Sequence, residues 1–334
     1  MTRPLAAAVA LVCAVVLGGC AQDPLPQPRP QEAAAATPVV GGGQLDRVLA
    51  GVVETMTAAD AALDPALLAP RVAGPAVELR TAGYTVRRAL PGNGVITPVG
   101  GQRLVDVVPQ EQEWPRTVMS VTQAAADDAV PELLLLTQAG PRDPYVLTAW
   151  ASLLPGVTVP TFAPAGEGVQ VPPVQEAGSL ALAPADVVAR YADVLTTGPG
   201  SQFAAGFGPD AFSAQVLSEQ ETERQSATVT CPGCFSYAVA HAPRADATWT
   251  LGTADGGAVV LGVLDSTRSL TVAAAGAKLP LVEDFAVLSG KTEAVSSASF
   301  TSVEVVAFLV PPAGSTDAVT VLASERALTA ATAS

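Results

Sequence analysis

Two cysteines separated by two residues form the sharpest chemical motif inside the chain. Cys231 and Cys234 frame a Pro-Gly pair, a spacing that suits a short disulfide, a thiol redox centre or half of a zinc site. A thioredoxin-like redox centre places its first cysteine at a helix N-terminus, whereas this motif lies between residues 226–229 and a predicted strand. Zinc needs four ligands, and His241 is the one nearby candidate. We therefore predict a structural disulfide, with reduced thiols and a redox pair as alternatives.

The only histidine of the chain lies in a run with strand-like alternation. In Phe235–His241, alternate side chains share one face of a strand, so Tyr237 and His241 point the same way. If that face lines a hollow, these two residues and Trp150 are candidate pocket residues. The competing interpretation is a hydrogen-bonded or solvated histidine and a tryptophan that anchors the core. One histidine excludes a histidine-rich metal site, and a Ser-His-Asp triad has no Gly-x-Ser-x-Gly motif to support it.

Carboxylates are numerous but do not form a recognisable catalytic set. They occur as Asp127-Asp128, as Glu219, Glu221 and Glu223, and as Glu283-Asp284, in stretches typical of loops or solvated helix faces. No spacing singles out a general acid and a general base. No P-loop and no dinucleotide-binding glycine pattern is present. We therefore expect no catalytic residues, no metal and no cofactor, and the chain is not expected to be an enzyme.

The charge balance excludes one class of partner. The chain has 17 Lys and Arg against 31 Asp and Glu, a formal net charge of −14, and its only lysines are Lys278 and Lys291. Nucleic-acid binding needs Lys and Arg to displace counterions from phosphates, so no nucleic-acid partner is expected. Electrostatic binding of a polybasic segment to anionic lipid headgroups is excluded for the same reason.

The N-terminus is built like a secretory leader. Arg3 precedes an apolar run, Leu5–Leu17, which is too short to span about 30 Å of hydrocarbon. The run ends in Leu17-Gly18-Gly19-Cys20, which resembles the lipobox of bacterial lipoproteins. That resemblance implies removal of residues 1–19 and acylation of Cys20, with two or three chains giving a stable anchor. We expect attachment to the extracytoplasmic face of the cell membrane, where disulfides persist. An ordinary signal peptide is the alternative.

The remaining chain predicts a tether followed by two helix-then-strand series. Prolines at alternate positions and a Gly-Gly-Gly joint make residues 20–44 an extended tether. The first domain, 45–160, contains three predicted helices and then four strands. A Pro/Gly-rich linker, 161–183, leads to a second domain, 184–330, with two helices and then strands. The predicted segments are helices 45–56, 66–72, 75–90, from 184 and from 209, and strands 103–108, 116–123, 132–138, 145–153, 235–241, 248–253, 258–264, 270–275, 302–309 and 318–324.

This order of elements predicts an α+β fold rather than alternating βαβ units. Helices followed by a curled antiparallel sheet, twice over, resemble the cone-shaped (cystatin-like) fold of the ketosteroid isomerase and nuclear transport factor two superfamily. The lipobox, the Pro-rich tether and the two modules together resemble a family of actinobacterial lipoproteins without an assigned activity. The resemblance implies two tandem cone-like domains, and it assigns a functional role to no residue beyond Cys20.

Three functions follow as hypotheses. The first is a membrane-anchored, non-catalytic module that binds an envelope protein or another envelope component, and it is the one we favour from the sequence. The second is a small-molecule or lipid binder that uses a cone-fold cavity. The third is a cone-fold enzyme, which would require a buried carboxylate with a raised pKa beside a tyrosine or His241.

Overall fold

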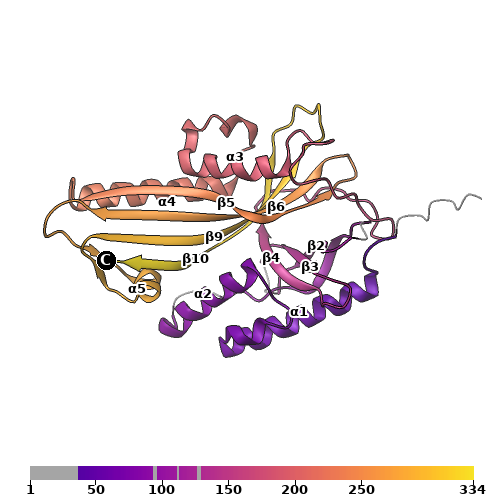
Figure 1. The fold of residues 1–334 in the computed structure, drawn as a ribbon, viewed down its shortest axis with the longest axis horizontal. Helices are drawn as coiled ribbons and strands as arrows, with labels where there is room; N and C mark the ends of the chain where they lie inside the picture. The colour runs from indigo at the N-terminus through magenta and orange to yellow at the C-terminus, as the bar shows by residue number, and fades with distance from the viewer. Residues whose placement is uncertain (1–36, 93–95, 111–112, 126–128) are drawn as a thin grey trace, which may run out of the picture. The chain divides into compact units, whose positions relative to one another are not determined.

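The computed structural model describes residues 37–334 apart from 93–95, 111–112 and 126–128 (Figure 1). The predicted leader, the lipobox with Cys20, most of the tether and the Asp127-Asp128 pair lie outside the described residues. Residues Ala36–Ser334 form one compact unit.

Eight antiparallel strands of this unit pair into one curled sheet (Figure 1). The strand order is β1-β2-β3-β4-β10-β9-β6-β5, so the first four strands follow one another and the last four are joined to them through β10. The strands are β1 Gln102–Val107, β2 Arg116–Gln123, β3 Glu132–Gln138, β4 Val146–Leu153, β5 Phe235–Gly252, β6 Ala258–Val272, β9 Ser297–Val310 and β10 Thr320–Ala333. The predicted α+β class is confirmed.

The N-terminal half follows the sequence closely. Helix α1, Gly42–Ala62, buries the predicted apolar stripe, and α2, Pro75–Ala89, begins at the predicted first-turn proline. The predicted helix 66–72 is only a 3₁₀ turn, η1 Pro65–Leu68, capped by the Asp64 side chain. Strands β2 and β3 match their predicted bounds to the residue.

The C-terminal half contains longer strands than the sequence predicts. Helix α3, Pro184–Thr197, begins where predicted. Helix α4, Ala211–Thr230, begins two residues after the predicted start at 209, because Asp210 caps it by accepting from Ser213 N at 2.7 Å. The two predicted strands 235–241 and 248–253 are one strand, β5, and the next two are one strand, β6. Short elements follow: β7 Leu279–Pro280, α5 Glu283–Ser289 and β8 Glu293–Ala294.

The two predicted domains share a sheet and a core. Strand β4 pairs with β10 at Leu153–Ala323 and Ser152–Ser324, and one apolar cluster contains residues from both predicted segments. The structure therefore does not confirm two tandem cone-like domains.

Strand β10 separates from β4 after only these two residue pairs. Beyond Ser324, β10 continues beside β9 alone, and β4 turns away from it (Figure 1). We call this divergence the fork. Four long strands continue past the fork, and we call this part of them the arm. It includes the start of β5 at Phe235, the end of β6 at Val272, the start of β9 at Ser297 and the end of β10 at Ala333. The other parts of these strands, together with β1–β4, α1 and α2, form the body.

Candidate functional site

The fork contains a cavity of about 650 Å³, which we call the fork cavity. Its walls come from α2, from the middle of α4, from the start of α5 and from residues 325–328 of β10. Because successive strand residues point to opposite faces, four consecutive lining residues show that the cavity wraps around the free edge of β10. The site therefore exists because β4 and β10 diverge at this point.

Glu325 and Trp150 face each other across the fork. Glu325 is the first β10 residue after the last pair with β4, and the Trp150 indole N–H donates a hydrogen bond to its carboxylate. Burial raises the pKa of Glu325 to about 7; the Arg80 charge and the Trp150 hydrogen bond oppose the rise, and Glu132 adds to it. A carboxyl group with this pKa is half ionised near neutral pH.

Arg80 carries buried positive charge into the wall of the fork cavity. Its side chain is 6 % exposed, its guanidinium carbon lies 5.0 Å from the centre of the Trp150 ring, and Nη2 donates to Thr97 O at 2.6 Å. Its Nε lies 3.6 Å from an Asp60 carboxylate oxygen, which also accepts the Tyr84 hydroxyl. Arg80 is thus engaged by protein groups before any ligand arrives.

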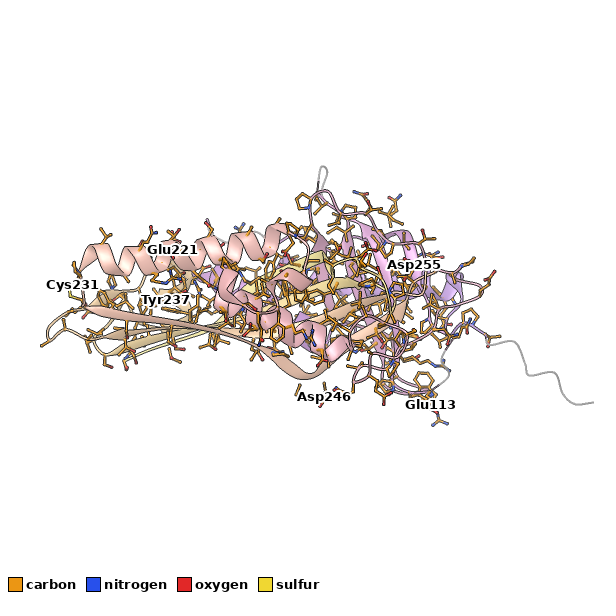
Figure 2. The ribbon with its side chains drawn as sticks, turned by 90° about the horizontal axis from the view of Figure 1, so that it is seen from above. Glu113, Glu221, Cys231, Tyr237, Asp246 and Asp255 are labelled. Atoms are coloured by element: carbon orange, nitrogen blue, oxygen red, sulfur yellow. A yellow bond between two sulfur atoms is a disulfide. The ribbon has the colours of Figure 1, made fainter. Side chains whose placement is uncertain are left out.

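The α4 side of the fork cavity is held by ion pairs rather than by apolar packing. Arg326 of β10 pairs with Glu219, and Arg268 of β6 pairs with Glu223. Tyr237 donates its hydroxyl to Glu223 at 3.0 Å, and burial raises its pKa. Figure 2 shows α4 lying along the strands with Tyr237 beneath it and Cys231 at its end. Helix α4 therefore covers the arm through polar contacts.

A second cavity, of about 400 Å³, lies farther out along the arm. We call it the arm-tip cavity. Its lining is largely apolar and includes Phe235, Leu270, Leu279 and Phe300. It shares Thr222, Glu223 and Phe285 with the fork cavity, so the two cavities meet at a common wall.

His241 is buried in a polar network under α4, behind the ion pairs that line the fork cavity. Gln220 Nε2 donates one hydrogen to Leu195 O at 3.1 Å, so its other hydrogen faces His241 Nε2, also at 3.1 Å. The ring proton is then on Nδ1, which donates to Glu304 Oε2 at 3.0 Å. The other Glu304 oxygen has no hydrogen-bond partner among the described residues. His241 lines only a cavity of about 10 Å³, so it is a structural cross-link between α4 and the sheet.

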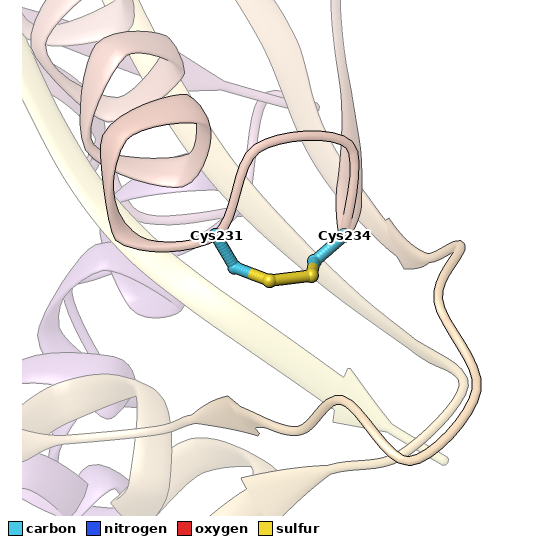
Figure 3. The surroundings of a disulfide bond; sticks show 2 residues. All are labelled: Cys231 and Cys234. Carbon is cyan, nitrogen blue, oxygen red and sulfur yellow. A yellow bond between two sulfur atoms is a disulfide. The ribbon is translucent and has the colours of Figure 1, made fainter.

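The structure joins Cys231 and Cys234 in the predicted disulfide (Figure 3). Their Cα atoms are 5.3 Å apart; Cys231 ends α4 and Cys234 immediately precedes β5. A helix C-terminus carries partial negative charge, which disfavours a thiolate. The position therefore supports a link between α4 and the sheet over a redox centre.

The three predicted pocket residues occupy three different places. Trp150 lines the fork cavity, Tyr237 reaches its wall through Glu223, and His241 lies behind that wall, in a small cavity that shares the two ion pairs of the wall. The sequence analysis missed Glu325 and Arg80. A signal for Arg80 exists, because Arg80 and Tyr84 are four residues apart on the buried face of α2, where an arginine needs a partner.

Two absences concern the part of the chain that the structure describes. There, no group of three or more His, Cys, Asp or Glu side chains could hold a metal ion. No described helix combines the length and the apolar character needed to cross a bilayer.

The chain belongs to the family described as Domain of unknown function (DUF8094), whose sequence model matches residues 36–333. The match spans both segments that we predicted as separate domains. No curated protein and no solved structure matches the chain. The resemblances to the cone-shaped fold and to actinobacterial lipoproteins therefore stay predictions.

Proposed function

We propose that this protein is a non-catalytic binding module that holds a small ligand in the fork cavity. The proposal places the module on the extracytoplasmic face of the cell membrane, anchored by acyl chains on Cys20. The anchor is supported by the order of Arg3, an apolar run and Leu17-Gly18-Gly19-Cys20. The two tandem cone-like domains are not needed for this function, because the fork belongs to the shared sheet.

The observation that carries the proposal is the fork cavity itself. Its volume of about 650 Å³ lies within the range of small-molecule sites, about 300–1,000 Å³. Apolar side chains of α2, such as Leu79 and Val86, line one side of the cavity, and eight charged side chains, Glu325 among them, line much of the rest. A concave site of this size, with an apolar face to bury part of a ligand and polar groups to orient it, can hold a small molecule. This favours small-molecule binding over the partner-protein interaction that the sequence alone suggested.

Binding is also favoured over catalysis by the partners of Glu325. Its pKa of about 7 suits proton transfer. However, its hydrogen-bond partner is the Trp150 N–H, which can donate but cannot act as a nucleophile or a base. His241, the other candidate for proton transfer, is occupied by Glu304 and Gln220. We therefore propose that Glu325 recognises a ligand rather than transforms one.

Gly83 offers a direct test. It lies within α2, lines the fork cavity, and a Cβ added there would meet no atom within 4 Å. Gly83→Phe should fill the cavity without disturbing the helix, and Gly83→Ala is the matched control. Fluorescence titration with Nile red, a neutral polarity-sensitive dye, should show saturable 1:1 binding that Gly83→Phe weakens at least tenfold. Gly83→Ala should stay within twofold of the unsubstituted protein. Absence of saturable binding, or equal binding by both variants, would contradict the proposal.

A further inference from the structure

The fork cavity and the arm-tip cavity form two unlike parts of one space. Both are lined by Thr222 and Glu223 of α4 and by Phe285 of α5. The separating side chain, Phe285, is only half-buried, and it belongs to a seven-residue helix without a buried residue. A ligand that passes Phe285 would therefore have one end in each cavity.

The arm-tip cavity suits a hydrocarbon chain. Its volume is about 400 Å³, and its wall consists mainly of Phe, Leu, Pro and Val side chains. Phe285 and Phe300 meet edge to face, with ring centroids 4.5 Å apart, at the end nearer the fork. Burial of alkyl groups against such a wall is favourable in proportion to the apolar area removed from water.

The fork cavity has an excess of negative charge. Five carboxylates line it, Glu219, Glu223, Glu283, Asp284 and Glu325, against three arginines, Arg80, Arg268 and Arg326. Each arginine is already engaged by a carboxylate: Arg326 by Glu219, Arg268 by Glu223 and Arg80 by Asp60. None of the described cations forms an ion pair with Glu283, Asp284 or Glu325. The lining carboxylates that have no ion-pair partner leave the cavity with a net negative charge, and a negative cavity favours a ligand with a cationic group.

Building on the proposed function, we propose that the ligand is a cationic single-chain amphiphile, with its ammonium group beside Glu325 in the fork cavity and its alkyl chain in the arm-tip cavity. The ammonium group supplies the ion-pair partner that Glu325 lacks among the described residues, since the Arg80 charge acts on Glu325 without forming an ion pair with it. The Trp150 ring already carries the Arg80 guanidinium, so the ammonium group is recognised through Glu325 and not through Trp150. An anionic head would meet Glu283, Asp284 and Glu325, while each arginine of the lining already faces a carboxylate.

The inference predicts how affinity depends on chain length and on head-group charge. Each buried methylene should tighten binding about fourfold until the arm-tip cavity is full. Calorimetric titration at pH 8 tests this with three probes below their micelle concentrations: dodecylammonium, butylammonium and dodecanoate. The full chain should carry Cys20→Ala, which removes the predicted lipid and the need for detergent. Dodecylammonium should bind at least 100-fold more tightly than butylammonium and at least tenfold more tightly than dodecanoate.

Two variants assign these preferences to the two cavities. Ala227 of α4 lines the arm-tip cavity, and Ala227→Trp should fill it and reduce the preference for the long chain to less than tenfold. Gln225→Trp, on the exposed side of the same helix, should leave that preference unchanged. Glu325→Gln should reduce the preference for ammonium over carboxylate about tenfold.

Failure of this inference and failure of the proposed function give different results. The inference is overturned if dodecylammonium and dodecanoate bind with equal affinity, or if the chain-length preference survives Ala227→Trp. The proposed function still stands in that case, provided that Gly83→Phe weakens Nile red binding. If none of the probes binds saturably and Nile red binding ignores Gly83→Phe, the proposed function fails as well.

Discussion

The body and the arm share one sheet but are stabilised in different ways. In the body, β2, β3 and β4 are buried over most of their length on both faces. In the arm, the first residues of β5 alternate between half-buried and exposed, and α4 is held there by ion pairs, a histidine network and a disulfide. A large apolar core fixes the body, whereas the arm relies on specific polar contacts and leaves space beside them. The proposed ligand site lies where the two regions diverge.

The comparison predicts that loss of apolar volume is most costly in the body. Leu135 is 0 % exposed at the centre of β3, whereas Leu270 of β6 is only half-buried in the arm. Leu135→Ala should lower the free energy of unfolding by about 3–5 kcal/mol, and Leu270→Ala by about 1 kcal/mol. Urea denaturation of the two variants measures both values. Equal losses would show that the arm is packed as tightly as the body.

Loss of a polar contact should be most costly in the arm. His241→Ala removes the donor to Glu304, whose side chain is fully buried, and should cost about 3 kcal/mol. Adding Glu304→Gln replaces the stranded carboxylate with a neutral amide. The double variant should therefore lose less stability than the sum of the two single variants, as a double-mutant cycle can measure. Additive losses would mean that the pair is not coupled.

Glu325 gives the fork a pH dependence with a defined sign. Folding raises its pKa from 4.5 to about 7, so between these values the folded state binds more protons than the unfolded state. This contribution lowers stability as pH rises from about 4.5 to about 7 and is constant above that. Burial also raises the pKa of Glu132, which adds in the same direction.

Glu325→Gln should remove this part of the pH dependence and raise the free energy of unfolding at pH 8 by about 1–3 kcal/mol. Denaturant titrations at pH 5 and pH 8 provide the measurement. If the variant is less stable than the unsubstituted protein at pH 8, the buried Glu325 carboxylate does not destabilise the folded state.

The disulfide should contribute less to global stability than the His241 network does. It closes a loop of only four residues, so replacing Cys231 and Cys234 together with serine should cost about 1–2 kcal/mol. Helix α4 would remain attached through Glu219 and Glu223. Thermal unfolding with and without reductant checks this value, and a loss as large as that of His241→Ala would place the main attachment of α4 at the disulfide.

The same contrast explains which elements could be predicted from the sequence. Strands β2 and β3 were predicted to the residue. Strand β3 contains four consecutive leucines, as a strand buried on both faces does, and β2 is rich in Val and Thr, which favour strands. The arm part of β10, from Glu325 to Ala333, is rich in alanine and contains two charges, so its composition does not favour a strand. Its long pairing with β9 overrides that preference.

The candidate site was predicted only where it touches the body. Trp150 lies on a predicted strand and does line the fork cavity. Glu325 follows directly after the predicted end of its strand at Ser324, so nothing in the sequence marked it as part of the site. The fork itself arises from pairing between β4 and β10, which are far apart in the chain, and no local pattern encodes where that pairing ends.

A crystal structure of the Cys20→Ala protein grown with dodecylammonium tests the central claim most directly. Our account predicts density for the ammonium group within hydrogen-bond distance of the Glu325 carboxylate, and for the chain running past Phe285 into the arm-tip cavity. Cavities closed by their own side chains, or the amphiphile bound elsewhere on the surface, would contradict it.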